Sequence, residues 1–399
     1  MLFKGGQICY GGIIVMTRST RRIFFYSAVA LFVLLAPVLI AYSIGYTFRP
    51  DTRSLERTGG IFIKSKTPRI SIFLDGIFIK ETSYFSGGAL LTEIVPGTHR
   101  LRLEKANYHP WSATIHVEPE LVTDLRNILL ITNPVVIATS SPDELISLRA
   151  AIINNTLPSA VPKETISIQD MSTPVPSPAF FLDTQGNLIG KTATTTSTLI
   201  SHINSFNVIE QMIYFINQSG FLGTLDPISQ RITTIGRPGF YLSGEPAQFS
   251  QIPDGRIVIL DASGGLFLSD SSTQIQTITG GVRQFAFDED GTKMLIRKDQ
   301  SVDIFWLKDN AFQPFEKSGT REQIFISDSA IQDADWFFAD NAHIAISTID
   351  GIFFTNIDVR YGKNTIQLFS KKTEELITIP SLPNTIFFRK EKVFYTISI

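Results

Sequence analysis

One apolar segment limits the fold of this chain more than any other feature. From Ile23 to Tyr46 the sequence is IFFYSAVALFVLLAPVLIAYSIGY, with no charged residue. At about 1.5 Å per residue, a helix of this length crosses a hydrocarbon core of about 30 Å. A buried core helix is the alternative, but a helix in a soluble protein keeps a polar face toward water and this segment has none. The sequence therefore predicts a single transmembrane helix over residues 23–46.

The charges beside this segment predict its direction across the membrane. Arg18, Arg21 and Arg22 lie directly before it, whereas the arginines after it are spread over residues 49–57. Positive charge close to the end of a membrane helix is retained in the cytoplasm. We therefore expect a single-pass protein of the cell membrane, with residues 1–22 as a cytoplasmic tail and everything after residue 50 extracytoplasmic.

A cleaved signal peptide is the alternative interpretation of the same segment. Its apolar region would span about 7 to 15 residues and end at small residues. Ala41-Tyr42-Ser43 fits that pattern poorly, so the sequence favours an uncleaved anchor. Met16 begins MTRSTRR, which resembles a natural start of translation. If translation starts there, residues 1–15 are an upstream extension. Met1 is the other candidate for the start.

Charge and cysteine content exclude several functions. The chain has 35 Lys and Arg against 37 Asp and Glu, for a net charge of -2. It therefore lacks the positive field that neutralises phosphates, and we expect no nucleic-acid partner. Cys9 is the only cysteine, so no intrachain disulfide and no multi-cysteine metal site can form.

A small antiparallel β domain is predicted over residues 58–130. This stretch consists of short runs in which apolar and polar residues alternate, such as GGIFIKS, RISIFLDGIFIKE and SATIHVEP. Alternation with period two is typical of half-buried strands. Asp75-Gly76 stands between two apolar runs, and a type I′ hairpin turn needs the positive φ values that this pair tolerates.

Four motifs in this domain occur in the order found in PEGA domains. They are Gly60 with Ile61 and Ile63, Leu74-Asp75-Gly76, Val95-Pro96-Gly97-Thr98-His99-Arg100-Leu101, and Ala106-Asn107-Tyr108. Residues 58–130 therefore resemble a PEGA domain, a small β-sandwich-like module of bacterial and archaeal surface proteins. Asn107 stands where the family usually has Gly, and Asn can replace Gly because it tolerates the left-handed conformation. The resemblance implies adhesion or scaffolding at the cell envelope and supplies no catalytic residue.

Residues 131–178 are rich in Pro and Ser and are predicted to be a linker. We expect short helical pieces around residues 143–154. We also expect a strand within about 131–148 that pairs with the C-terminal strands and closes the domain that follows.

A repeating β pattern occupies residues 179–399. The clearest units are AQFSQIPDGRIVIL from Ala247, RQFAFDEDGTKMLI from Arg283 and DADWFFADNAHIAI from Asp333. Phe285 and Trp336 occupy the same place in their units, and a D-G or D-N pair follows in each. A repeat of about 35 to 50 residues with four strands is typical of a propeller blade. The sequence predicts a mainly β fold that ends in a β-propeller of about six or seven blades, similar to WD40-like or TolB-like propellers although the G-H and W-D dipeptides are missing.

Three sets of side chains suggest chemistry, and the sequence favours a structural role for each. They are His99, His109 and His116 as metal ligands, Asp288, Glu289 and Asp290 as a calcium site, and Asp333 with Asp335 as a carboxylate pair for glycoside hydrolysis. The histidines lack a carboxylate at fixed spacing, the acidic run reads as a solvent-facing turn, and the aspartates belong to a blade motif. Hydrolase, zinc-protease and nucleotide-binding motifs are missing from the sequence. We therefore predict no catalytic residue, metal site or cofactor.

These features predict a non-enzymatic, membrane-anchored extracytoplasmic scaffold that binds a protein or a cell-envelope polysaccharide. The alternative is an envelope enzyme that processes glycan or peptide in the funnel of the propeller. A sensor is a third hypothesis, but residues 1–22 leave no room for a cytoplasmic enzyme domain. Trp111, Trp306 and Trp336 are the candidate binding residues, although such side chains pack more often than they bind.

Overall fold

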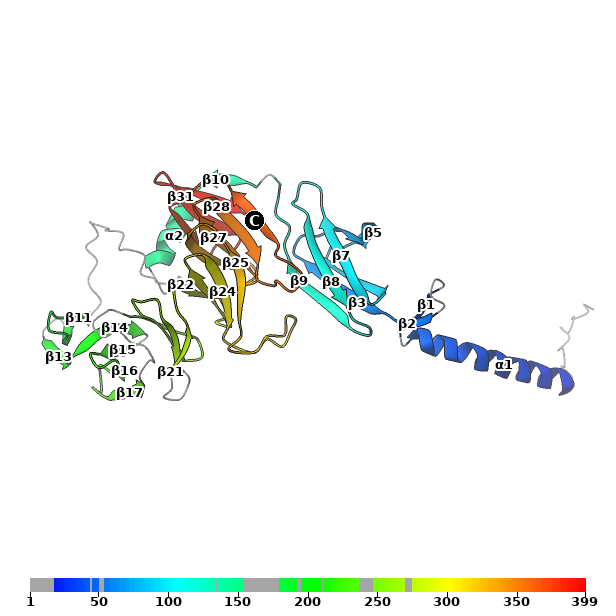
Figure 1. The fold of residues 1–399 in the computed structure, drawn as a ribbon, viewed down its shortest axis with the longest axis horizontal. Coiled ribbons are helices and arrows are strands. Elements are labelled where there is room, and N and C mark those ends of the chain that lie inside the picture. Colours follow the sequence, from blue (N-terminus) through cyan, green and yellow to red (C-terminus); the bar gives the residue numbers. More distant parts are fainter. Residues whose placement is uncertain are drawn as a thin grey trace, which may run out of the picture.

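The computed structural model describes residues 18–43, 45–49, 54–133, 135–153, 179–191, 195–209, 211–236, 247–269 and 275–399 (Figure 1). The fold of these residues is mainly β. An N-terminal apolar helix is followed by small sheets and then by several four-stranded antiparallel sheets consistent with propeller blades. Cys9, Met16 and the part of the predicted linker over residues 154–178 lie outside the described residues.

Helix α1 runs from Arg18 to Ser43. Its segment Arg18–Ala41 is long and apolar enough to cross a membrane, and none of it is buried against the described chain. The helix begins before the predicted boundary at Ile23 because helical hydrogen bonding continues through arginines that an apolar run excludes. It ends before Tyr46, the other predicted boundary, because that residue begins strand β1.

A short hairpin joins α1 to the first β domain. It consists of β1 (Tyr46–Arg49) and β2 (Ser54–Arg57), which pair antiparallel. The backbone N–H of Thr58 donates to the Gly45 carbonyl at 2.9 Å, and its hydroxyl donates to the same oxygen at 3.0 Å. Because these bonds close the hairpin, the chain leaves it beside Gly45, two positions after the last residue of α1. The β domain therefore starts next to the end of the helix.

Two small sheets form this first domain, which we call the N-module. Their strand orders are β6-β3-β9 and β5-β4-β7-β8. The strands are β3 (Gly59–Ser65), β4 (Ser71–Leu74), β5 (Ile77–Glu81), β6 (Gly88–Ile94), β7 (Gly97–Glu104), β8 (Trp111–Val117) and β9 (Val122–Ile128). The pairs are antiparallel except β3 with β9, which is parallel. Both sheets contribute to one apolar core that includes Ile61, Ile72, Leu101 and Leu125.

Two turns of the N-module have the backbone conformations that the sequence predicts. Asp75 and Gly76 have φ values of 51° and 84°, and Leu74 pairs with Ile77 across them. This two-residue loop with positive φ at both positions is the expected hairpin turn. Asn107 has a φ of 64°, the left-handed conformation expected of a residue that replaces Gly.

Six further sheets follow, five with four strands and one with three among the described residues. The first three comprise β11 (Ala179–Leu182), β12 (Leu188–Lys191) and β13 (Thr196–Ile200); β14 (Ile203–Ile209), β15 (Met212–Asn217), β16 (Leu222–Leu225) and β17 (Ile232–Gly236); and β18 (Gln248–Gln251), β19 (Ile257–Leu260), β20 (Leu266–Ser269) and β21 (Ile275–Thr279). The next two comprise β22 (Val282–Phe287), β23 (Lys293–Lys298), β24 (Ser301–Trp306) and β25 (Arg321–Ile326); and β26 (Ile331–Phe337), β27 (His343–Thr348), β28 (Gly351–Asn356) and β29 (Thr365–Phe369). The last is formed by β30 (Glu375–Thr378), β31 (Thr385–Lys390) and β32 (Val393–Ser398), with β10 (Ile137–Thr139) at its edge.

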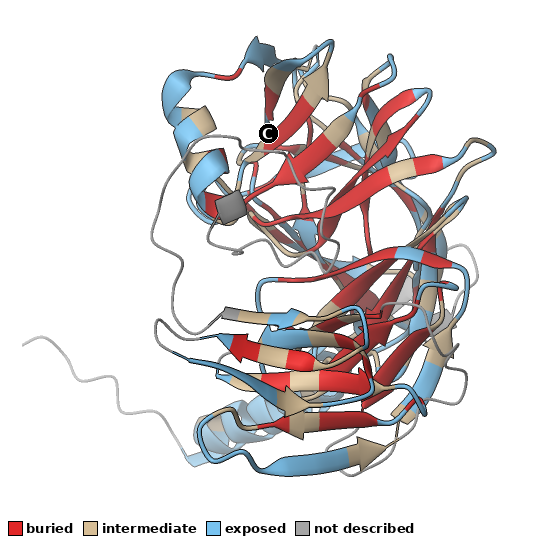
Figure 2. Cartoon of the chain, turned by 90° about the vertical axis from the view of Figure 1, so that its left-hand side faces the viewer, coloured by how far each residue is buried: buried red, intermediate tan, exposed pale blue. Residues whose placement is uncertain are grey.

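The blades repeat the same local structure at the positions that the sequence motif predicts. Phe285 and Trp336 lie in the first strands β22 and β26, and both are fully buried. The turns that follow a first strand place Gly255, Gly291 and Asn341 at positive φ. The fourth strands β17, β21, β25 and β29 are more exposed than the strands before them (Figure 2). Each blade thus buries its inner strands and leaves its last strand toward solvent.

The last blade is completed from the linker region. Strand β10 pairs antiparallel with β32, with Ile137 opposite Ile397. The predicted closing strand is confirmed only over these three residues, because α2 (Pro142–Ile153) begins soon after them. Ser141 and Glu144 cap this helix reciprocally: the Ser141 N–H donates to Glu144 Oε2 at 2.6 Å, and the Glu144 N–H donates to Ser141 Oγ at 3.3 Å. Leu148 of α2 packs against the last blade.

Candidate functional site

The propeller holds one edge of the N-module through a side-chain amide. Strand β9 is an edge strand, and Gln313 lies beside it in the loop after β24. Gln313 Nε2 donates to the Val122 carbonyl at 3.2 Å, and Gln313 Oε1 accepts from the Asp124 N–H at 3.0 Å. These are the bonds that a further strand would make. The amide therefore covers backbone groups at the edge of the sheet.

Arg360 and Tyr361 strengthen the same junction. The Arg360 guanidinium donates to Gln313 Oε1 at 3.1 Å and to the Asp124 carbonyl at 3.4 Å. Burial would lower the pKa of Arg360, but the hydrogen bond and charge of Asp358 outweigh that effect and the pKa is raised. Tyr361 packs against the core of the N-module, its carbonyl accepts from the Thr114 N–H at 3.2 Å, and burial raises the pKa of its hydroxyl. The two domains are thus joined by hydrogen bonds of half-buried and exposed side chains and by the packing of Tyr361.

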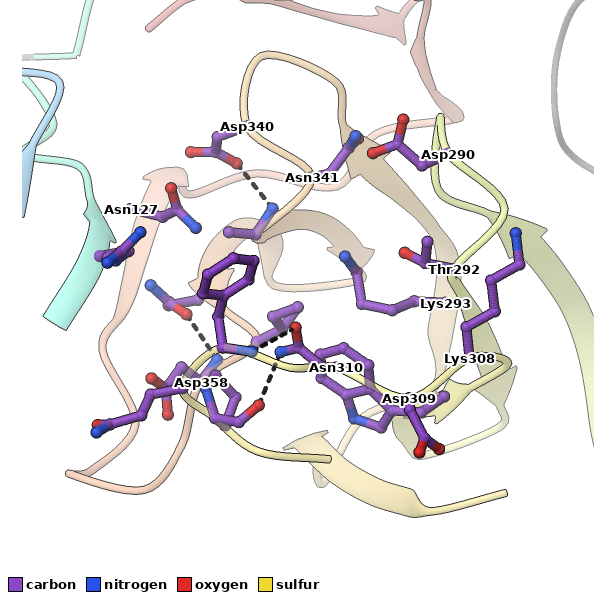
Figure 3. Close-up of a pocket in the computed structure, with 18 residues that line it drawn as sticks. Asn127, Asp290, Thr292, Lys293, Lys308, Asp309, Asn310, Asp340, Asn341 and Asp358 are labelled. Carbon is purple, nitrogen blue, oxygen red and sulfur yellow. Dashed lines mark hydrogen bonds between the residues drawn. The ribbon is translucent and has the colours of Figure 1, made fainter. Parts of the chain in front are cut away.

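A pocket of about 330 Å³ lies at this junction, and we call it the junction pocket (Figure 3). Its volume is within the range of small-ligand sites. The lining residues are Arg126 and Asn127 of β9, Asp290, Thr292, Lys293 and Trp306 with the loop residues Lys308, Asp309, Asn310, Phe312, Gln313 and Pro314 of one blade, and Asp340, Asn341, Ala342, Asn356, Ile357 and Asp358 of the next. Figure 3 shows Asn127 on one side of the space and Asp290, Lys293 and Lys308 on the other.

Three of the four carboxylates in the pocket are already paired. Asp309 lies 2.8 Å from Lys317 Nζ, Asp340 lies 2.8 Å from His343 Nδ1, and Asp358 lies 2.7 Å from Arg360 Nη2. The hydrogen bond from Lys317 is the main cause of a lowered pKa at Asp309.

The pKa of Asp340 is subject to opposing effects. Burial would raise its pKa, but the charge and hydrogen bond of His343, the Ala342 N–H and the charge of Lys66 together outweigh burial, and the pKa is lowered. A carboxyl with a lowered pKa is a poor general acid at neutral pH. The paired carboxylates therefore fit a structural role better than proton transfer.

Trp306 and Asn341, which line the pocket, each hold a buried polar atom without a partner among the described residues. They are the indole Nε1 of Trp306, a donor, and Oδ1 of Asn341, an acceptor. Burial of a polar atom without a hydrogen bond costs about 1–3 kcal/mol, so most such atoms in folded proteins have a partner. Both atoms are covered by the protein, so a ligand in the pocket reaches them only if neighbouring side chains move.

Lys293 adds a positive charge beside the indole. Its ammonium lies 5.5 Å from the ring centroid of Trp306 and 5.7 Å from that of Trp336. It also forms an ion pair of 3.0 Å with Asp288. The cation is thus held in place by an acid and two aromatic rings, and Figure 3 shows its side chain pointing into the pocket.

The three predicted tryptophans lie in different surroundings. Trp306 is 6% exposed and lines the junction pocket. Trp336 is 0% exposed, and its Nε1 donates to the Ala286 carbonyl at 3.0 Å, so this side chain packs inside the propeller. Trp111 packs against the core of the N-module and lines a separate pocket of about 110 Å³ with His109. The structure therefore brings only Trp306 to the junction pocket.

The other candidate sets also occupy defined places. His99 lies 2.7 Å from Asp75, His116 lies 3.4 Å from Thr98, and His109 lines the pocket beside Trp111. Within the described ranges, His, Cys, Asp and Glu side chains form no group of three that could hold a metal ion.

The prediction that Asp288, Glu289 and Asp290 form a solvent-facing turn is wrong for one of the three residues. Asp288 was expected to face solvent, but its side chain is buried because it accepts from the N–H groups of Thr292 and Lys293 at 2.7 and 2.8 Å. It closes the turn after β22. Glu289 and Asp290 are exposed as expected.

Asp333 and Asp335 face the same way on β26. Both are buried, and they accept from the N–H groups of Leu376 and Thr378 at 3.4 and 3.2 Å. They lie within the strand rather than at a turn. Their carboxylates connect adjacent blades.

Sequence reasoning did not find Asn341 or Gln313. Asn341 had a usable signal, because it takes the place that Gly255 and Gly291 occupy in other blades. An Asn at a left-handed position adds a side-chain amide where the repeat needs none. Gln313 had no local signal, because its partner Val122 lies 191 positions away.

Comparison with known proteins gives structural likeness alone. No family model and no curated protein matches the sequence. Solved propeller structures match over the C-terminal half. The extracellular domain of BT4673 from B. thetaiotaomicron is 12% identical with a TM-score of 0.35, and the match covers 55% of this chain and 32% of that one.

Two further structures give similar values. YCF48 from Cyanidioschyzon merolae is 10% identical with a TM-score of 0.35, over 55% of this chain and 79% of that one. The gluconolactonase XC5397 from Xanthomonas campestris is 12% identical with a TM-score of 0.29, over 54% and 79%. Scores this low carry no argument about function, and the propeller assignment rests on the sheets of this chain.

Proposed function

We propose that this chain is a non-enzymatic, membrane-anchored extracytoplasmic binding protein. In this proposal α1 is an uncleaved anchor with the N-terminus in the cytoplasm. The N-module, which resembles a PEGA domain, and the propeller together form the scaffold. The ligand is a peptide segment or an envelope polysaccharide that enters the junction pocket.

The observation that carries the proposal is the junction pocket itself, a cavity of about 330 Å³ lined by Trp306, Lys293 and Asn341. An extended peptide offers a carbonyl and an N–H at each residue, and a sugar offers hydroxyls that both donate and accept. Either ligand can bond to the polar side chains that line the pocket. The indole and Lys293 also suit a sugar face or a peptide carboxylate.

The test is a binding screen with the full chain in lipid nanodiscs. Cell-wall peptides and envelope polysaccharide fragments are titrated, and released sugar and peptide are measured in the same samples. We expect binding without turnover. Turnover of any bound ligand would instead support the envelope-enzyme alternative.

Asn341→Gly tests the site, because Gly keeps the positive φ of 52° and removes only the side-chain amide. Loss of one hydrogen bond of about 0.5–1.5 kcal/mol should weaken binding about 2- to 10-fold. Asn107→Gly is the matched control, since Asn107 also has positive φ but lies outside the pocket. Equal affinity of both variants and the unmodified chain would contradict the assignment.

A further inference from the structure

A shallow groove of about 370 Å³ lies beside the junction pocket, between the N-module and the propeller. Phe62 of β3 lines it from the N-module, together with its cross-strand partner Leu90 of β6 and with Val122 of β9. Phe312 and Phe315, from the loop after β24, line it from the propeller. Most of the lining side chains are apolar, and we call this space the apolar groove.

The loop that carries the two phenylalanines is held by its own hydrogen bonds. Asn310 Nδ2 donates to the Pro314 carbonyl at 2.7 Å, and the Asn310 N–H donates to the Glu316 carbonyl at 2.8 Å. Phe312 and Phe315 are nevertheless 64% and 70% exposed. Exposed apolar side chains that gather in one groove mark an interaction surface. Because the loop is already fixed, a ligand loses little affinity to the ordering of these residues.

Arg126 connects the apolar groove with the junction pocket, since it lines both spaces, as do Phe312 and Gln313. Its guanidinium lies 5.8 Å from the ring centroid of Phe62 and 5.5 Å from that of Phe312. Arg126 Nε donates to Asp124 Oδ2 at 2.7 Å, whereas its two terminal nitrogens make no hydrogen bond to a described residue. These N–H groups can donate to a carbonyl of a ligand that extends from one space into the other.

The composition of the apolar groove distinguishes the two ligand classes of the proposed function. The charged residues that line it, Asp124 and Arg126, pair with each other, so an uncharged group suits it best. A sugar would place hydroxyls against Leu90 and Val122, whose side chains offer no hydrogen bond, and such burial is costly. A peptide avoids this cost, because an apolar side chain can enter the groove while the polar backbone stays outside it.

We propose that the ligand of this protein is a peptide, and that the apolar groove binds one of its uncharged apolar side chains. A backbone carbonyl beside that side chain accepts from Arg126, and the following residues enter the junction pocket. This inference rests on the proposed binding function and selects the peptide over the polysaccharide. It differs from that function in the residues it depends on, because Phe315 lines the groove alone and Asn341 lines the pocket alone.

Binding to two defined probes tests the proposal with the full chain in lipid nanodiscs. One probe is a set of decapeptides selected on the unmodified chain from a random phage-displayed library and synthesised with blocked ends. The other is a tetrasaccharide of N-acetylglucosamine. Phe315→Ser removes a side chain of the apolar groove, and Phe85→Ser is the matched control, since Phe85 is 95% exposed and lines neither space. An unchanged midpoint of thermal unfolding shows that both variants fold.

The proposal predicts that the selected peptides share an apolar position and bind Phe315→Ser at least about 10-fold more weakly, with no change for Phe85→Ser. Equal binding to Phe315→Ser and to the unmodified chain would overturn the inference. The junction pocket stands in that case if Asn341→Gly still weakens binding.

The remaining outcomes separate the other occupants. Binding of the tetrasaccharide without selection of any peptide would overturn the inference and leave the binding function standing. A dimer of the unmodified chain that Phe315→Ser dissociates would assign the groove to a second copy and would also overturn it. Binding of neither probe would contradict both the inference and the proposed function.

Discussion

Strands β5 and β9 are both edge strands of the N-module, and they have opposite surroundings. The edge of β9 is covered by the amide of Gln313 and by Arg360, both from the propeller. No described strand pairs with the outer edge of β5, and all five of its residues are exposed. An uncovered apolar edge invites pairing with other chains, so folded proteins usually cover or charge it.

This difference shows which edge of the N-module is covered by the rest of the protein. The propeller fixes the N-module through β9, and the inner sheet face supplies the apolar core. Among the described residues, no strand pairs with the outer edge of β5. One edge of the module is therefore internal to the protein, and the other is external.

The largest expected difference in the free energy of unfolding is between substitutions in β4 and β5, the two strands of one hairpin. Ile72 in β4 is fully buried, whereas Ile77 in β5 is exposed. We expect Ile72→Ala to lower the free energy of unfolding by about 2–5 kcal/mol because it leaves a cavity in the core. Ile77→Ala should change it by less than about 0.5 kcal/mol. Urea unfolding of the full chain in detergent measures both, and a comparable loss for the two variants would show that β5 packs inside the protein.

The second prediction removes the cover of β9. Gln313→Ala removes the partner of the Val122 carbonyl and the Asp124 N–H, at a cost of about 0.5–1.5 kcal/mol for each lost hydrogen bond. Gln323→Ala changes an exposed Gln in β25 and is the matched control, with little expected effect. Hydrogen exchange measures the result as faster exchange at Asp124. Unchanged exchange there would mean that the amide does not hold the edge.

The third prediction compares the Asp–His pair near each edge. The pKa of Asp75, in the hairpin of β5, is lowered chiefly by its hydrogen bond to His99; the pKa of Asp340, at the junction, is lowered although burial opposes it. A carboxyl with a lowered pKa stabilises the fold above its unfolded pKa of about 3.8, and this stabilisation is lost as the pH falls through the lowered value. The midpoint temperature of thermal unfolding should therefore decrease as the pH is lowered below about 4.

Replacing either Asp75 or Asp340 by Asn should reduce this dependence of the thermal midpoint on acid pH. The side chain of Asp340 is 1% exposed and that of Asp75 is 50% exposed, so water screens the second pair more strongly. We expect Asp340→Asn to reduce the acid dependence of the thermal midpoint more than Asp75→Asn. The reverse order would contradict the burial of the junction pair.

The smallest expected effect on stability concerns β5 itself. Ile79→Lys places a charge on an exposed side chain and should change the free energy of unfolding by less than about 0.5 kcal/mol. Urea unfolding of the full chain in detergent measures the change. A loss well above about 0.5 kcal/mol would show that Ile79 packs inside the protein.

Features that depend on residues close together in the sequence could be predicted from it. The Asp75-Gly76 turn, the left-handed Asn107 and the buried Phe285 and Trp336 all follow from local patterns, and the structure confirms them. The burial of Asp288 was missed because its hydrogen bonds form only when the turn closes.

The candidate site was predicted only in part, because it lies between domains. Trp306 was named from its residue type, but its unpartnered Nε1 depends on how two blades and β9 meet. The Gln313 contact spans 191 positions and has no local pattern. Such contacts follow from the packing of whole domains, which residue patterns do not encode one by one.

The most direct test of the binding proposal uses the three tryptophans as internal probes. The full chain is labelled with 5-fluorotryptophan, and its three fluorine resonances are assigned from single Trp→Phe variants. During titration with the peptide or polysaccharide fragment that binds, we expect the Trp306 resonance to shift while the buried, bonded Trp336 resonance stays in place. A saturating ligand that leaves the Trp306 resonance unchanged would contradict binding in the junction pocket.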